Sequence, residues 1–167
     1  MTIHVLERTQ LVPRENPAVF SFFRDPHNLA LITPPWLNFR VRELSDASVR
    51  QGTRIGYTIK WLGLPMKWDS LIDRYEEDVC FADRMIRGPY RSWHHLHHFA
   101  SVSGGVEMID RVEYEIPLGP LGDFAHSMMV KRQLHAIFDY RARMIPQLLR
   151  KDQRVAPRVR LPSATRP

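Results

Sequence analysis

The order of hydrophobic and polar residues predicts a strand, two short helices and then a run of strands. Residues 2 to 12 alternate apolar and polar side chains, which is typical of a half-buried strand. The pairs Asn16-Pro17 and Asp25-Pro26 each precede a short apolar run, and such pairs favour the first turn of a helix. Strand-like stretches separated by turn residues follow at 36–51, 53–62, 66–75 and 79–87. This spacing predicts an antiparallel meander.

A long hairpin is expected within residues 88 to 116. Gly104 and Gly105 lie between two stretches of alternating residues, and glycine tolerates the positive φ that both central positions of a tight hairpin turn require. A turn centred on them pairs Phe99 with Asp110 and places Asp110 diagonal to His97. One face is then mostly apolar and aromatic, and it carries Trp93, His95, His97, Phe99, Met108, Asp110, Val112, Tyr114 and Ile116. The opposite face is mostly polar and is expected to meet water.

A long helix is predicted after the hairpin. From Leu121 onwards apolar residues recur at helical spacing over about seven turns. The apolar stripe comprises Phe124, Ala125, Met128, Leu134, Ile137, Phe138, Ile145 and Leu148. Pro146 is expected to kink or end this helix. The elements together predict an α+β fold with a curved antiparallel sheet of about seven strands, two short helices and a long C-terminal helix.

Length and composition indicate one ordinary globular domain. The chain has 167 residues, of which 44% are hydrophobic, and its only cysteine is Cys80, so no internal disulfide is possible. It contains no apolar run of the roughly 18 residues that would span a membrane. Its first ten residues lack the charged start and apolar run of a signal peptide. We therefore expect a cytoplasmic protein without membrane insertion.

The positive charge is concentrated at the C-terminus. Residues 150 to 167 hold six basic side chains and one acidic one, whereas the other 149 residues carry 18 basic and 17 acidic ones. A nearly neutral body argues against nucleic-acid binding, for which a basic face is needed. We predict a domain over residues 1–149 and a basic, disordered tail over 150–167. Use of the tail in protein interaction, including a homodimer, stays open.

Four motifs carry a resemblance to a known family. They are Phe81-x-Asp83, Gly88-Pro89-Tyr90-x-x-Trp93-x-His95-x-His97-x-Phe99, Asp110-x-Val112-x-Tyr114 and Ile137-Phe138-x-Tyr140-Arg141. With the order of elements over residues 2 to 149, the chain resembles the START-like or SRPBCC superfamily, which includes lipid-transfer domains, polyketide cyclases and plant pathogenesis proteins. The motifs are similar to those of a bacterial, ligand-binding branch. The resemblance implies a helix-grip fold with an apolar cavity between sheet and long helix, but it implies no particular reaction.

The inward polar residues of the hairpin are the candidate reactive groups. Unpaired polar groups in an apolar face cost about 1 to 3 kcal/mol each, so His95, His97 and Asp110 need a reason to be there. They are candidates for proton transfer together with Tyr114, since histidine titrates near neutral pH. A structural pair of His97 and Asp110 is the plainer alternative. A metal site would need Asp110 as its third ligand, and no glutamate follows the two histidines as in a cupin, so no metal is expected.

Aromatic residues complete the predicted binding site. Tyr57, Trp68, Trp93 and Tyr114 are expected to form its apolar wall together with Phe138 from the long helix, alongside His95 and His97. Arg141 would pair with a ligand carboxylate or an inward acid, or extend to water. The chain lacks a phosphate-binding glycine loop, a Gly-x-Ser-x-Gly elbow and paired cysteines, so no cofactor is expected. We predict binding of a small hydrophobic or amphipathic molecule, with a cyclase/dehydratase-type enzyme and a protein-interaction module as alternatives.

Overall fold

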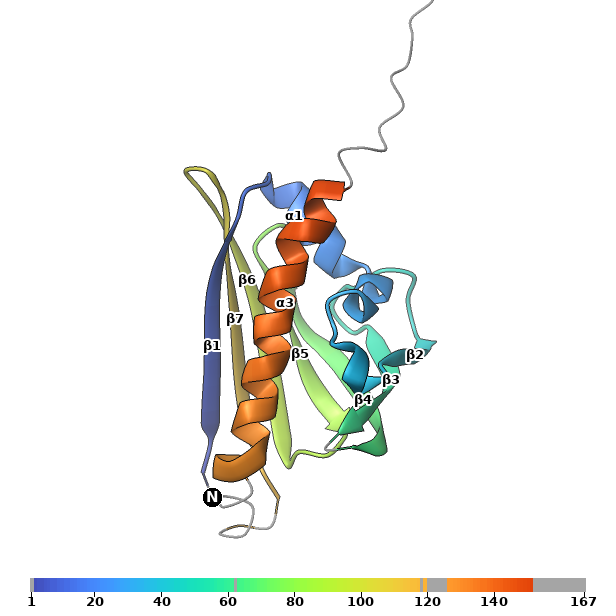
Figure 1. Ribbon diagram of the computed structural model, residues 1–167. Coiled ribbons are helices and arrows are strands. Elements are labelled where there is room, and N and C mark those ends of the chain that lie inside the picture. The colour runs from blue at the N-terminus through green and yellow to red at the C-terminus, as the bar shows by residue number, and fades with distance from the viewer. Residues whose placement is uncertain (1, 62, 118, 120–125, 152–167) are drawn as a thin grey trace, which may run out of the picture.

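The computed structural model describes residues 2–61, 63–117, 119 and 126–151, and over them the chain forms one curved antiparallel sheet that wraps around a long helix (Figure 1). The sheet has seven strands in the order β1-β7-β6-β5-β4-β3-β2. Their bounds are His4–Val12 for β1, Arg40–Leu44 for β2, Arg54–Trp61 for β3, Leu64–Glu76 for β4, Cys80–Arg87 for β5, Ser92–Val102 for β6 and Gly105–Glu115 for β7. The predicted fold class is confirmed.

Two short helical segments follow β1, as predicted. Helix α1 (Asn16–Arg24) begins at the first Asx-Pro pair. The second segment is a 3₁₀ helix, η1 (Pro26–Ala30), and the Asp25 carboxylate accepts a hydrogen bond from the backbone N–H of His27 at its start. A further 3₁₀ turn, η2 (Pro35–Leu37), occupies the beginning of the stretch predicted as a strand, so β2 starts only at Arg40. These segments cover part of the concave face of the sheet beside the long helix (Figure 1).

The predicted hairpin exists, but its register is shifted by two residues. Val102 pairs with Gly105, so the turn residues are Ser103 and Gly104, and Asp110 lies directly opposite His97 instead of opposite Phe99. The shift of two leaves every side chain on its predicted face.

Gly105 explains why the predicted turn was wrong. Its φ is +147°, and a Cβ there would clash with the carbonyl oxygen of Val12 at the end of β1. The second glycine therefore serves the close approach of β1, and only Gly104, with φ of +91°, supplies the turn.

The long helix α3 (Lys131–Lys151) follows a π-helical turn, η3 (His126–Val130), and crosses the concave face of the sheet (Figure 1). Pro146 does not end α3, which contradicts one of the two predicted outcomes. Proline at this position deprives the Ala142 carbonyl of its helical donor, and the side-chain amide of Gln10 on β1 donates to that carbonyl at 2.7 Å. Helix and edge strand are thereby joined where the helix ladder is interrupted.

Three parts of the helix prediction need comment. Leu121, Phe124 and Ala125 lie outside the described residues. Met128 is exposed, so it is wrong as a member of the apolar stripe. Helix α3 includes positions 150 and 151, which were assigned to the tail, and positions 152–167 lie outside the described residues, so the division into domain and tail stays a prediction.

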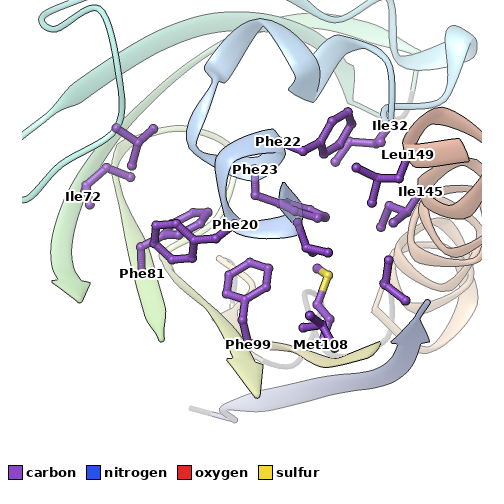
Figure 2. Packing of buried hydrophobic residues seen from close by; sticks show 14 of the residues in the cluster. Phe20, Phe22, Phe23, Ile32, Ile72, Phe81, Phe99, Met108, Ile145 and Leu149 are labelled. Carbon is purple, nitrogen blue, oxygen red and sulfur yellow. The ribbon is translucent and has the colours of Figure 1, made fainter. Parts of the chain in front are cut away.

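A densely packed aromatic core lies where α1 meets the sheet (Figure 2). The Phe20 ring packs edge-on against Phe81 and Phe99 with centroids 6.0 and 5.3 Å apart. Ile145 and Leu149 reach this core from α3. The core fixes the helix at one end of the sheet. Among the described residues, no helix has the length and apolar character needed to cross a membrane.

Candidate functional site

A cavity of about 160 Å³ lies between the sheet, the η1–η2 segment and α3. Seven of the eight residues predicted to bind a ligand line it. They are Tyr57, Trp68, Trp93, His95, His97, Phe138 and Arg141. The eighth, Tyr114, does not line the cavity, and neither does the proton-transfer candidate Asp110. The sequence therefore located part of the sheet and helix sides of the cavity wall, because inward-facing positions on β3, β4, β6 and one face of α3 are recognisable from periodicity alone. It did not predict the part of the wall formed by α1 and the η1–η2 segment.

Aromatic rings form much of the wall. Trp68 on β4 stacks with Tyr57 on β3 at a centroid distance of 5.7 Å, and it packs edge-on against Trp93 at 5.1 Å. Burial raises the pKa of the Tyr57 hydroxyl well above its ordinary value, so this group stays a neutral hydrogen-bonding group near neutral pH. The wall is thus apolar with a few polar tips, as in most small-molecule sites.

Tyr114 belongs to the layer behind the cavity. Its ring packs against Tyr90 and Trp93 at centroid distances of 5.6 and 6.0 Å, and only 2% of the residue is exposed. Burial raises its pKa to about 12. From this position Tyr114 supports the aromatic wall, and it is not placed to exchange a proton with a molecule in the cavity.

A buried polar cluster lies on the cavity wall, and Asp110 is at its centre. The Oδ1 atom of Asp110 lies 3.0 Å from Nε2 of His95, 2.7 Å from Nδ1 of His97 and 3.5 Å from Nη1 of Arg141. The contact with His95 is a hydrogen bond, whereas the Nδ1 atom of His97 approaches at short distance without hydrogen-bond alignment. Each of the four residues is at most 7% exposed. The sequence correctly placed His95, His97 and Asp110 on the inner side of the fold, whereas for Arg141 it left open an extension to water.

Charge compensation keeps Asp110 ionised. Burial alone would raise its pKa, but the close approach of His97, the hydrogen bond with His95 and the charge of Arg141 outweigh burial and hold the pKa well below its ordinary value. For His95, burial and the neighbouring His97 and Arg141 lower the pKa to about 3, against the opposing effect of Asp110. His95 is therefore a neutral imidazole whose one N–H points to Asp110.

A second carboxylate, the partly buried Asp83 on β5, faces His95 from the other side. Its Oδ1 accepts a hydrogen bond from the Ser70 hydroxyl at 2.9 Å, and that hydroxyl accepts one from the Trp68 indole N–H at 3.0 Å. Its Oδ2 lies 3.7 Å from Nδ1 of His95. Burial raises the pKa of Asp83 despite the opposing effects of His97, the Ser70 hydroxyl and Arg141.

Sequence reasoning did not include Asp83 among the site residues. The missing information was the pairing of β5 with β6, in which Asp83 lies directly opposite His95. The available signal was that Asp83 lies two residues after the apolar Phe81 in a predicted strand, so both side chains are expected on the inward face, next to the strand with the two histidines.

Arg141 is buried and does not extend to water. Its guanidinium lies over the Phe138 ring at 5.1 Å, and its Nε and Nη1 atoms have no hydrogen-bond partner among the residues that the structure describes. Of the predicted alternatives, the structure shows pairing with an inward acid, Asp110. Its Nη1 atom is the one that pairs with Asp110, so Nε is the donor left without an acceptor, on a residue that lines the cavity.

Comparison with solved structures shows the same fold in proteins of low sequence identity. The Zhui aromatase/cyclase from Streptomyces sp. R1128 is 14% identical with a TM-score of 0.74, over 93% of this chain and 99% of that one. A norcoclaurine synthase mutant from Thalictrum flavum in complex with a transition-state analogue is 14% identical with a TM-score of 0.67, over 91% and 97%. Ara h 8.0201 is 17% identical with a TM-score of 0.61, over 90% and 99%.

No protein-family model matches this chain, and no curated protein does. The structural matches establish that the chain has the helix-grip fold, the fold of the START-like or SRPBCC superfamily that its motifs resemble. At these identities the likeness concerns the fold, and the site of this chain has to be interpreted from its own residues.

Proposed function

We propose that the protein binds a small amphipathic molecule in the cavity between sheet and helix. The observation that carries the proposal is the combination of an aromatic wall with a cavity-lining arginine, Arg141, whose buried Nε donor has no acceptor among the described residues. A buried donor without an acceptor costs about 1 to 3 kcal/mol, and a bound oxygen atom would recover that cost. Two solved structures of the same fold, the aromatase/cyclase and the norcoclaurine synthase complex, are of proteins whose names indicate small-molecule chemistry.

The size of the cavity limits the ligand. A cavity of about 150 Å³ in another protein accommodates one benzene ring, and the cavity here has about 160 Å³. A molecule with one ring, or an aliphatic molecule of similar bulk, carrying a carboxylate or carbonyl oxygen therefore fits best. The oxygen would face Arg141, and the ring would contact Trp68 and Trp93.

Tryptophan fluorescence tests this proposal because Trp61, Trp68 and Trp93 all line the cavity. Titration with a panel of one-ring aromatic acids and their uncharged amides should change the emission saturably for at least one acid. Replacement Ile59→Trp, which fills the cavity, should abolish the binding of that acid. The same replacement at exposed Ile86, which does not line the cavity, is the matched control and should preserve binding.

Native mass spectrometry of freshly purified protein provides an independent search for a natural ligand. A co-purifying small molecule should be retained by the Ile86→Trp control and lost from the Ile59→Trp variant. The proposal of ligand binding in this cavity is wrong if both variants bind the acid panel as the wild type does. It is also wrong if the wild type binds none of the panel and carries no co-purifying molecule.

The polar cluster favours a second candidate, an enzyme of the cyclase/dehydratase kind. His95 lies at the cavity with its N–H fixed by Asp110, so the lone pair of its Nδ1 atom is free to accept a proton. In such an enzyme Arg141 would stabilise an enolate oxygen and His95 would remove a proton next to the carbonyl. Tyr114 has no direct part in this scheme because of its position behind the wall. Deuterium exchange into a bound β-dicarbonyl compound, lost in His95→Gln and kept in His94→Gln, is the expected result.

A further inference from the structure

Two groups that can ligate a metal ion face each other at the cavity. Nε2 of His95 makes the hydrogen bond with Asp110 at 3.0 Å, so Nδ1 is the ring nitrogen directed away from Asp110. The atom that it faces, at 3.7 Å, is the carboxylate Oδ2 of Asp83. The separation is too long for a hydrogen bond.

His97 adds a third such group. One ligand atom each from Asp83, His95 and His97 lies within 4.8 Å of the other two. Ligand atoms on a single metal ion lie about 3 to 4 Å apart, since metal–nitrogen and metal–oxygen bonds are about 2.0 to 2.2 Å long. Movements of about 1 Å by these side chains would bring the three atoms to bonding distance. The pairing of β5 with β6 places Asp83 directly opposite His95.

From this arrangement we infer that Asp83, His95 and His97 form a binding site for a divalent transition-metal ion, with Asp110 as the carboxylate that orients the two imidazoles. Two imidazoles and one carboxylate are a ligand set that Zn²⁺ and Fe²⁺ favour. The histidines of metal sites commonly donate their second N–H to a carboxylate, which fixes the tautomer and the ring orientation. Asp110 has this position relative to His95, and the Ser70 hydroxyl similarly holds Asp83.

The electrostatics of the site favour a cation. Asp110 is buried and Asp83 is partly buried, and Arg141, 3.5 Å from Asp110, is the one guanidinium within salt-bridge distance of either carboxylate among the described residues. A divalent ion would supply the countercharge that Asp83 lacks. Since all three proposed ligands line the cavity, the remaining coordination positions would face the space proposed for the small molecule.

The site is tested with the metal alone by titrating zinc into the chelator-treated full-length protein in a calorimeter, which measures the affinity and the number of ions bound. We expect one ion per chain and a 100-fold or greater loss of affinity in Asp83→Asn. The variant Asp110→Asn should lose about 10-fold to 100-fold, the range typical of residues that orient metal ligands. The matched control is His94→Gln, because His94 is the neighbour of His95 on the outer face and contacts Asp73 there.

Binding of Co²⁺ provides a second readout, and it does not require that the protein bind the small molecule. The visible spectrum of bound Co²⁺ should show a coordination with fewer than six ligands in the wild type and in His94→Gln, and this spectrum should be lost in Asp83→Asn. If Asp83→Asn does not fold, His97→Gln takes its place with the same expectation. Equal zinc affinity in wild type and Asp83→Asn, loss of zinc binding in His94→Gln, or no binding by the wild type would each overturn the metal site. None of these results would depend on whether the aromatic acids bind.

Discussion

Two neighbouring inward pairs of the β6–β7 hairpin have opposite characters. Phe99 pairs with Met108, and two residues along the strands His97 pairs with Asp110. All four side chains are buried to a similar extent, with exposed fractions between 1% and 6%. The first pair packs into the aromatic core beneath α1 (Figure 2), whereas the second makes close polar contacts, and its His97 lines the cavity.

Two pairs only about 7 Å apart along the strands therefore have different roles: one serves stability and the other is available for function. The apolar pair contributes to folding through removal of surface from water, and it needs no partner of defined chemistry. The polar pair must have its hydrogen-bonding and charge requirements met, and the structure meets them only in part, since Arg141 keeps an unpaired donor at Nε. A ligand that supplies the missing hydrogen-bond partners of such a cluster would gain binding free energy from it.

The largest effect on stability is expected from the apolar pair. The Phe99 ring has the rings of Phe20, Phe23 and Phe81 around it at centroid distances of 5.3 to 6.1 Å. Phe99→Ala should lower the free energy of unfolding by about 3 to 5 kcal/mol because it leaves a void in a closely packed region. Urea denaturation measures this loss. A loss below about 1 kcal/mol would mean that this core is loosely packed and that the contrast between the two pairs is mistaken.

The next largest effect is expected from the polar pair, and it should depend on Arg141. Asp110→Asn leaves the buried guanidinium without a counterion and should cost about 3 kcal/mol. Adding Arg141→Met to that variant should recover most of the loss, because the uncompensated charge is then removed. A double-mutant cycle in urea gives the coupling energy. Strictly additive losses would show that Asp110 and Arg141 do not stabilise each other.

The same contrast explains what could be predicted from sequence. Alternation with period two located the inward faces of β3, β4 and β6, and helical periodicity located Phe138 and Arg141 on α3. Pairing between strands is a long-range property, and periodicity does not determine it. The two-residue shift of the hairpin and the position of Asp83 opposite His95 therefore appeared only in the structure. The continuation of α3 past Pro146 likewise depends on Gln10, a residue 136 positions away in the chain.

A smaller effect is expected at the turn that sets the hairpin register. Gly105→Ala introduces a Cβ toward the Val12 carbonyl at a backbone φ that favours glycine, and it should cost about 2 kcal/mol. Gly104→Ala, at a position with open space around it, is the matched comparison and should cost less, through strain at positive φ alone. Thermal unfolding of both variants measures the difference. If Gly104→Ala is the more damaging of the two, the turn is centred as the sequence suggested and His97 does not oppose Asp110.

The smallest effect on stability is expected from removal of the basic tail, which should contact neither the Phe99–Met108 pair nor the His97–Asp110 pair. Residues 152–167 include four arginines and three prolines and few large apolar side chains, so they offer little burial to offset the entropy lost on ordering. Truncation after Lys151 keeps all of α3, including the Leu149 carbonyl that accepts a hydrogen bond from Arg14 at 2.5 Å. The midpoint of thermal unfolding should therefore stay within about one degree of the full-length value, and the response of tryptophan fluorescence to ligand should be unchanged.

A matched truncation after Met144 removes Ile145 and Leu149 from the aromatic core and should lower the midpoint strongly. A fall of many degrees on truncation after Lys151 would show instead that the tail docks on the domain or on a second copy of it.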